Sequence, residues 1–483
     1  MVRTLNLLQL LSLLSVGVAV CLTVPLLVAL LLGDGGLVPL ALAMAAALGT
    51  GLVFGLSFRR PGREFSHREG LLFVVLAWLV AASLGALPFY FSPQFDSFTD
   101  AFFESMSGFT TTGSSVLTDI EALPGSLHFW RHFTHWIGGM GIILLGIAIL
   151  PLIGVGGMEL YRAEFSGARS DKVKPRIAET AKALWKIYVF ITVALYIALR
   201  LAGMGRLDAA CHTFSTMGTG GFSTRNGSIE AFGSPAIELI LTVFMLLAGI
   251  NFTLHYRLMV ERRPSRFFRD VELRAYLFLA GLITLVIAAG LVHSGLSSYV
   301  DAARLAVFQT VSIMTTTGFN SADFELWPAL AQFLLFTAMF LGGCTGSTAG
   351  GLKTARIVLL SRVVGREFRR LVSRRGVFAI RLNEGLVSEN AVQSLLNLVY
   401  LAFLVFFGTS ILLTAVGVDV LTAMTATSAS MFNVGPGLGR VGPTDNYAHI
   451  PAFGKWVLSL CMLAGRLEYY TFLVLFAPVF WRK

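Results

Sequence analysis

The chain has 483 residues, of which 55% are hydrophobic and only 13% are charged, and its mean hydropathy is +0.75. These values exclude an ordinary soluble domain and indicate a polytopic helical membrane protein. The formal net charge of +10 does not indicate nucleic-acid binding, because the basic residues gather at alternate ends of the apolar segments.

Ten apolar segments are predicted to cross the membrane, whose hydrocarbon core requires about 20 residues of helix. They are residues 5–33, 36–57, 70–91, 127–150, 184–203, 235–258, 273–294, 329–361, 394–417 and 452–480. The first could imitate a signal peptide, but its long apolar run and the second apolar segment after it indicate a retained span.

The basic runs indicate which ends of these spans face the cytoplasm. They occupy residues 59–69, 161–176, 256–274, 361–376 and 481–483. The positive-inside rule places all of them in the cytoplasm together with both termini, and ten spans satisfy that parity. The same charges are expected to attract anionic membrane lipid.

Four polar stretches of similar sequence recur along the chain. They are SGFTTTGSS (107–115), STMGTGGFS (215–223), SIMTTTGFN (312–320) and ASMFNVGPG (429–437). Their predicted central glycines are Gly113, Gly220, Gly318 and Gly435, so successive copies are 107, 98 and 117 residues apart. A period near 100 residues is too long for a solenoid and suits a duplicated membrane unit.

Each unit reads as an apolar span, a short helix, the polar stretch and a closing span. The short helices are predicted to be re-entrant with an aspartate N-cap, the candidates being Asp96 or Asp100, Asp208, Asp301 and Asp419. A second small-residue site recurs in each closing span: WIGGMG (136–141), LLAGIN (246–251), FLGGCT (340–345) and MLAGRL (462–467). Taken singly, such sites are equally well explained by close helix packing.

The predicted fold class is therefore an all-α polytopic membrane protein with two N-terminal spans and four pseudo-fourfold repeats around a central pore. The predicted units are an accessory pair at 1–60 and pore repeats at 68–160, 180–260, 270–365 and 390–483.

Irregular backbone at membrane depth is tolerated only where protein buries it or where it lines a water-filled path. A glycine with positive φ lets consecutive carbonyls point in one direction, and four such sets can replace the hydration shell of a monovalent cation. The C-terminal ends of the short helices add partial negative charge. No acidic residue lies in the stretches, which argues against a carboxylate ring. The predicted potassium-binding filter residues are Thr111, Thr112, Gly113, Thr219, Gly220, Thr316, Thr317, Gly318, Asn433, Val434 and Gly435.

The third closing span, FLGGCTGSTAGGLKTAR (340–356), holds five glycines within ten residues. Each glycine costs about 1 kcal/mol relative to alanine in a helix, so this density predicts a break beneath the filter. The alternative is a kinked helix packed closely on a neighbour. The predicted gate residues of this segment are Gly342, Gly343, Thr345, Gly346, Gly350 and Gly351.

Arg466 is the second predicted gate component, aligned with Met140, Ile250 and Cys344 of the other units. A charged residue in the middle of a span is a functional hypothesis by default. Its cation would repel potassium below the filter and could donate hydrogen bonds to loop carbonyls, holding the loop closed. The alternative is a purely structural ion pair with Glu468.

In combination these motifs resemble the Trk/Ktr/HKT superfamily of cation transporters over the whole chain. The two extra N-terminal spans, the length and the NVGPG of the fourth copy are most similar to the bacterial TrkH branch. The resemblance implies potassium preference, because glycine at the first filter position, here Gly113, accompanies it whereas serine accompanies sodium permeation. It also implies an intramembrane gating loop at 340–356, a homodimer with one pore per subunit, and a cytosolic nucleotide-binding regulatory subunit of the TrkA or KtrA kind. The expected location is the bacterial cytoplasmic (inner) membrane.

The sequence therefore predicts potassium uptake through a gated carbonyl filter, with a sodium-permeable or non-selective transporter of the same fold as the alternative. Four direct repeats fit an inverted-repeat solute transporter poorly. No clustered catalytic residues, ATPase motif or Rossmann fingerprint occurs in the sequence, so neither enzymatic activity nor a nucleotide in this chain is expected. Channel-like and ion-coupled flux both stay open.

Overall fold

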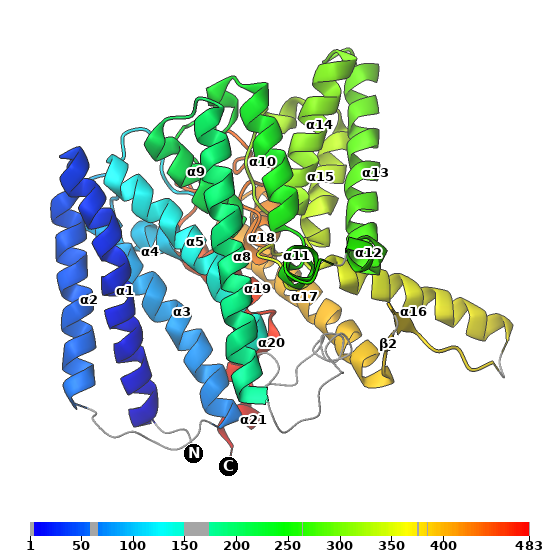
Figure 1. The fold of residues 1–483 in the computed structure, drawn as a ribbon, viewed down its shortest axis with the longest axis horizontal. Helices are drawn as coiled ribbons and strands as arrows, with labels where there is room; N and C mark the ends of the chain where they lie inside the picture. Colours follow the sequence, from blue (N-terminus) through cyan, green and yellow to red (C-terminus); the bar gives the residue numbers. More distant parts are fainter. Residues whose placement is uncertain are drawn as a thin grey trace.

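The computed structural model describes residues 4–57, 66–148, 173–262, 264–373, 376–383 and 385–482. Apart from a small antiparallel hairpin, β1 (Arg381–Leu382) and β2 (Gly385–Leu386), the described residues form helices and their connections (Figure 1). Much of the predicted basic runs at 59–69 and 161–176 lies outside the described residues.

Two long apolar helices, α1 (Thr4–Leu32) and α2 (Leu37–Ser57), pack against each other at one edge of the bundle (Figure 1). They also contact the first span of the pore region. Their outward faces expose large apolar side chains, for example Leu31 at 86%. Such exposure is expected where lipid is the solvent, and this pair is the predicted accessory element.

Four units follow, and each contains a span, a pore helix and a closing span. Unit 1 comprises α3 (His67–Tyr90), α4 (Phe98–Phe109) and α5 (Gly125–Ala148). Unit 2 comprises α8 (Val173–Leu201), α9 (Arg206–Gly218), α10 (Pro235–Ala248) and α11 (Phe252–Met259). Unit 3 comprises α13 (Val271–His293), α14 (Tyr299–Met314), α15 (Ala329–Leu341) and α16 (Thr354–Val372). Unit 4 comprises α17 (Glu389–Ala415), α18 (Val420–Met431), α19 (Ala452–Arg466) and α20 (Tyr470–Leu473).

Short connecting helices complete the fold. They are η2 (Glu230–Phe232), α12 (Pro264–Arg269), η3 (Phe324–Leu326), η4 (Val474–Phe476) and α21 (Pro478–Trp481). The core lies around the pore helices, since every residue from Ala101 to Phe109 in α4, Ser215 to Gly218 in α9, Phe308 to Met314 in α14 and Thr425 to Met431 in α18 is buried. The four pore helices are therefore enclosed by the spans, as the predicted fold class requires.

The predicted aspartate N-cap is confirmed only at Asp419 in α18, whose carboxylate accepts the N–H of Thr422. Serines cap α4 and α14 instead: Ser97 and Ser298 each accept the N–H of an aspartate three residues later. Those aspartates still lie in the first helical turn, where the partial positive charge of the helix favours them. The candidate positions that do not serve as N-caps are Asp96, Asp100, Asp208 and Asp301.

Breaks occur in three of the closing spans, although only the one in unit 3 is predicted. α10 and α11 meet at 98°, and α19 meets the α20–η4 segment at 117°. A continuous helix over 235–258 or 452–480 is therefore wrong. Among the described residues, six single helices are long and apolar enough to span a membrane, and the two bent pairs raise the number to eight. The remaining two predicted spans correspond to α5 and α15.

Candidate functional site

All four pore helices end in the same backbone motif. One residue at each helix end has a positive φ between 54° and 56°: it follows the helix cap in α4, α14 and α18, and it is the cap itself in α9. These residues are Thr111, Thr219, Thr316 and Asn433. The N–H of the next residue returns to the helix carbonyl five positions earlier at 2.8 Å in every copy. The N–H of the left-handed residue itself donates to the carbonyl three positions earlier. The two bonds together form a Schellman ending.

Three of these left-handed residues are threonines, and a β-branched residue rarely adopts positive φ. Strained backbone of this kind persists only where the surroundings over-determine it, which is common at functional sites. Its recurrence at Thr111, Thr219 and Thr316 is therefore a property of the repeat.

The glycine two positions beyond each left-handed residue touches the following unit. A Cβ built on Gly113 would lie 2.0 Å from the carbonyl oxygen of Gly220, and a Cβ built on Gly221 would lie 1.9 Å from the carbonyl oxygen of Thr317. A Cβ built on Gly318 would lie 2.0 Å from the carbonyl oxygen of Val434. A Cβ built on Gly435 would lie 2.8 Å from the carbonyl oxygen of Thr112. The contacts run from unit 1 to 2, 3, 4 and back to 1. The four stretches therefore form a closed ring, here called the glycine ring.

This ring corrects the predicted register of the second stretch by one residue. Gly221, not Gly220, has positive φ (75°) and touches the next unit. Gly220 instead corresponds to Thr112, Thr317 and Val434. The sequence Thr-Gly-Gly allows either glycine to be central, and the left-handed threonine before them decides between the two.

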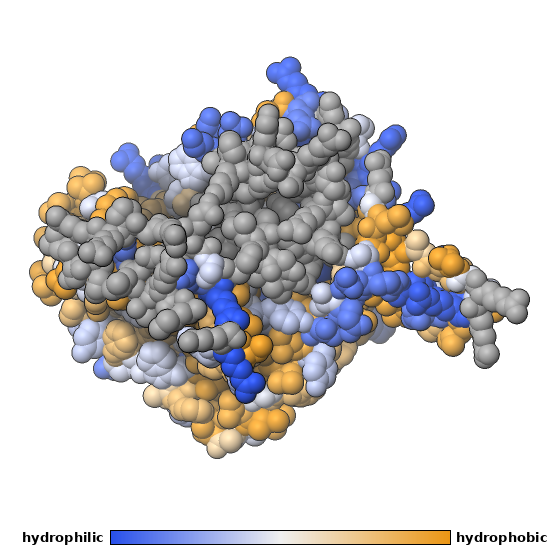
Figure 2. Space-filling view, turned by 90° about the horizontal axis from the view of Figure 1, so that it is seen from below, coloured by the Kyte–Doolittle hydropathy of each residue, from blue (hydrophilic) through white to orange (hydrophobic). Residues whose placement is uncertain are grey.

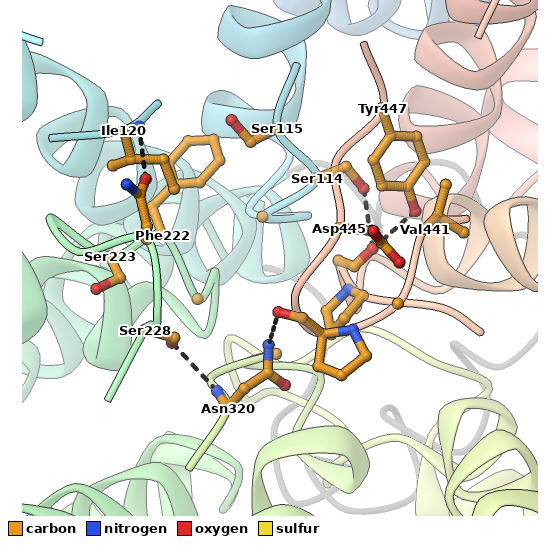
Figure 3. Close-up of a pocket in the computed structure, with 18 of the residues that line it drawn as sticks. Ser114, Ser115, Ile120, Phe222, Ser223, Ser228, Asn320, Val441, Asp445 and Tyr447 are labelled. Carbon is orange, nitrogen blue, oxygen red and sulfur yellow. Dashed lines mark hydrogen bonds between the residues drawn. The ribbon is translucent and has the colours of Figure 1, made fainter. Parts of the chain in front are cut away.

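All eleven predicted filter residues lie in the ring or directly beside it, and Gly221 is the member that the sequence prediction missed. All four glycines of the ring line one cavity, together with residues of the loops that connect the pore helices to the closing spans (Figure 3). In Figure 3 the hydroxyl groups of Tyr447 and Ser114 point toward the same place. Both donate to the carbonyl of Gly435, at 2.8 and 3.2 Å.

A hydrogen-bonded link joins three units around this cavity. The amide of Asn320 donates to the Pro443 carbonyl at 3.1 Å, and its backbone N–H donates to the Ser228 hydroxyl at 3.2 Å (Figure 3). Since these loops follow the ring glycines directly, the link holds the mouth of the ring in one arrangement.

A buried ion pair lies behind the first two stretches and has no counterpart in the sequence prediction. Arg131 Nε is 2.6 Å from Glu104 Oε1, and both side chains are almost fully buried. The guanidinium also donates to the Ser223 carbonyl and stands 3.4 Å from the centre of the Phe222 ring. Glu104 accepts in turn from the hydroxyl of Ser115. The sequence does contain a signal for this pair, because Glu104 in FFESM and Arg131 in WRHF are charged residues within largely apolar segments.

The predicted break in unit 3 is present: α15 ends at Leu341, α16 begins at Thr354, and residues 342–353 form a loop. The kinked-helix alternative is therefore wrong. The loop lies against the C-terminal ends of the pore helices of units 3 and 4. Gly350 donates its N–H to the Thr316 hydroxyl at 2.6 Å, and Gly351 donates to the Phe432 carbonyl at 3.1 Å.

Neighbouring helices anchor the other end of this loop. Glu272 on α13 accepts the backbone N–H groups of Thr345 and Ala355 at 2.6 and 3.0 Å. The N–H of Cys344 donates to the carbonyl of Gly249 at 2.8 Å, inside the break of unit 2. All six predicted loop residues of the gate thus lie within one hydrogen-bonded segment, in which Gly342 and Gly343 are buried and the other four are partly buried.

Arg466 is the last residue of α19 and is 4% exposed. It donates to the carbonyl of Thr348 in the loop at 2.9 Å and to that of Gly138 in α5 at 3.0 Å. The predicted contact with loop carbonyls is therefore present. Glu468 pairs with Arg356 at 2.6 Å, so the alternative pair of Arg466 with Glu468 is wrong.

The second small-residue site is a place of close helix packing in units 1 and 4. A Cβ built on Gly138 would lie 1.9 Å from the Phe109 carbonyl oxygen, and one on Gly465 would lie 1.9 Å from that of Met431. This equivalence aligns Arg466 with Gly139 rather than with the predicted Met140.

Comparison with known proteins gives a consistent result. The TrkH family, described as cation transport protein, matches residues 40–483. The Trk system potassium uptake protein TrkH of Escherichia coli (strain K12) is 44% identical over 465 residues, 95% of each chain. The Trk system potassium uptake protein TrkI of Halomonas elongata is 34% identical over 99% of this chain and 96% of its own. The crystal structure of the potassium transporter TrkH from Vibrio parahaemolyticus superposes with a TM-score of 0.92, at 41% identity over 99% of this chain and 100% of that one.

Glu104→Ala is expected to destabilise the fold strongly, because it leaves Arg131 buried without its partner. Breaking a buried pair in this way costs about 3–5 kcal/mol. Thermal unfolding in detergent, followed by tryptophan fluorescence, measures the effect. Glu121→Ala is the control, since it removes an exposed partner of Arg225 at 3.7 Å and leaves the midpoint nearly unchanged. Equal midpoints for the two variants would contradict a structural role for the buried pair.

Proposed function

This chain belongs to the TrkH family of cation transport proteins, and on that basis we propose that it takes up potassium through the glycine ring. One observation carries the proposal: the ring glycines of four successive units each touch a carbonyl of the next unit, in cyclic order. Its relatives are named potassium uptake protein and potassium transporter, and these names support the same substrate.

The ring has the chemistry that a dehydrated monovalent cation needs. Backbone carbonyls replace hydration water without adding fixed charge, and no acidic side chain lies in the four stretches. The pore helices α4, α9, α14 and α18 end at the ring, so the partial negative charge of each C-terminus lies next to it. Potassium is the transported substrate in this proposal, bound by the carbonyls of the eleven predicted residues and Gly221.

The loop over 342–353 and Arg466 form the proposed gate. The loop lies on the inner side of the ring, where Gly350 and Gly351 contact it directly. Arg466 adds a buried positive charge and ties the loop to α5 through two carbonyls. A cation at this place disfavours potassium entry and stabilises the closed loop at the same time.

The proposal extends to assembly: a homodimer in the bacterial inner membrane, with both termini cytoplasmic and a nucleotide-binding regulatory subunit of the TrkA or KtrA kind on the inner face. The helix α16 extends from the bundle as an arm (Figure 1), and its hydrophilic residues form a band beside hydrophobic ones (Figure 2). That amphipathic, basic arm supports contact with anionic lipid headgroups.

Gly113→Ser is expected to lower potassium preference over sodium by about tenfold, or about 1.4 kcal/mol. The new Cβ would lie 2.0 Å from the Gly220 carbonyl oxygen, so that carbonyl must move. Rubidium and sodium uptake into liposomes containing the purified protein measures the ratio.

Gly203→Ser is the matched control for backbone strain. Gly203 also has positive φ (92°), but a Cβ there meets nothing within 4 Å. The control is expected to keep the wild-type ratio. A Gly113→Ser ratio equal to that of wild type contradicts the filter assignment, and a wild type that passes sodium as readily as potassium supports the sodium-permeable or non-selective alternative.

Arg466→Ala is expected to raise potassium flux in the same liposomes, since losing even one hydrogen bond from a charged donor shifts a closed–open equilibrium about tenfold. Arg466→Lys keeps the charge but loses the fork that reaches two carbonyls, so an intermediate flux is expected. Arg200→Ala, which removes an arginine bound to the Met204 carbonyl at the end of α8, is the control. Unchanged or reduced flux in Arg466→Ala would rule out the gate role.

Light scattering of the detergent-purified protein is expected to give twice the mass of the 52.3 kDa chain, corrected for bound detergent. A single-chain mass, retained on transfer to lipid nanodiscs, contradicts the homodimer.

A further inference from the structure

We propose that His135 on α5 is a positioning residue for the glycine ring, because its imidazole occupies the space of the side chain that Gly220 lacks. The inference rests on the proposed function, since it concerns the carbonyls of the same ring. It assigns a selectivity role to a histidine outside the four polar stretches.

Unit 2 differs from the other three at one ring position. The residue that follows the left-handed position is Thr112, Thr317 or Val434 in units 1, 3 and 4, and each carries a branched side chain. The hydroxyl groups of Thr112 and Thr317 each contact the threonine two positions earlier at 2.8 Å. In unit 2 this position is Gly220, which brings no side chain to pack behind the backbone.

His135 fills that place from a neighbouring unit. A Cβ built on Gly220 would lie 2.3 Å from Nδ1 of His135 and 2.5 Å from two of its ring carbons. The imidazole is fully buried and stacks on the Phe222 ring, with the centroids 4.1 Å apart and the planes at 17°. Because the imidazole is packed between Gly220 and Phe222, it cannot withdraw without leaving a cavity beside Gly220.

The imidazole also contacts the residue to which Gly220 is hydrogen-bonded. His135 Nδ1 lies 3.1 Å from the hydroxyl of Ser215, and the carbonyl of Ser215 accepts the N–H of Gly220 at 2.8 Å. One side chain therefore touches both partners of the bond that ends α9. The carbonyl of Gly220 is in turn the group that approaches Gly113.

The backbones of the two helices are also in contact at this point. A Cβ built on Gly218 would lie 2.4 Å from the carbonyl oxygen of His135. The backbone of His135 is thus packed directly on α9, so a small movement of α5 would be transmitted to Gly220. By contrast, His128 lies two turns earlier on α5, is also buried, and has its ring contact with His132 at a 6.0 Å centroid distance.

A swap of side-chain volume tests this role. His135→Ala removes the imidazole, Gly220→Thr introduces the residue type that units 1 and 3 have at this position, and the double variant combines the two substitutions. His135→Ala is expected to lower the potassium-over-sodium uptake ratio about tenfold. Gly220→Thr alone is expected to lower it as well, because its Cβ meets the imidazole. The double variant is expected to recover to within about threefold of wild type.

His128→Ala is the matched control, since it deletes the same side chain from the same helix away from the ring, and it is expected to keep the wild-type ratio. Wild-type selectivity in His135→Ala overturns the inference, as does a double variant no better than the worse single one. If His135→Ala does not fold, Gly220→Thr decides alone, because unchanged selectivity there means that the imidazole does not fill the site. A wild type without selectivity overturns the proposed filter itself, which separates the two failures.

Discussion

Backbone polar groups inside a membrane find no water, so each N–H and C=O at that depth needs a partner within the protein. The centre of this molecule contains four chain reversals and a twelve-residue loop (342–353), and that constraint determines how they are built. Each pore helix ends by returning an N–H to its own last turn at 2.8 Å. The loop takes its partners from the ends of two pore helices and from Glu272. Units 3 and 4 therefore cannot separate without exposing unsatisfied backbone, and the geometry that would suit a cation also satisfies the buried chain.

Within this common plan the fourth unit differs from the others. Asparagine replaces threonine at its left-handed position, and its contact with the next unit is looser, 2.8 Å against about 2.0 Å elsewhere. The carbonyl of Gly435 already accepts from Tyr447 and Ser114. Burial raises the pKa of the Tyr447 phenol, so this group remains a donor at physiological pH. The carbonyl of one ring glycine, Gly435, is thus shared with side chains of the protein, and the ring has lower symmetry than its repeats.

Much of this arrangement could be predicted from the sequence because its signals are local and repeated. Four similar glycine-containing stretches about 100 residues apart identify the pore units, and five glycines within ten residues identify the break after Leu341. Other features depend on contacts between distant residues. The break after Ala248 contains a single glycine, and its geometry is completed by the N–H of Phe252 donating to the carbonyl of Gly346. The Glu104–Arg131 pair joins different helices, and the choice between Gly220 and Gly221 needs the neighbouring unit. No local pattern contains that information.

The hydrogen bond from Gly350 to Thr316 joins the proposed gate to the proposed ion site. Two parts in direct contact are energetically coupled, and this coupling is reciprocal. If the loop must release the Thr316 hydroxyl in order to move, an ion that stabilises the ring in one shape also changes how readily the loop leaves. Occupancy of the ring would then set the open probability, and the affinity of the ring for its ion would change with the loop. A transporter built in this way senses its own cargo without a separate receptor site.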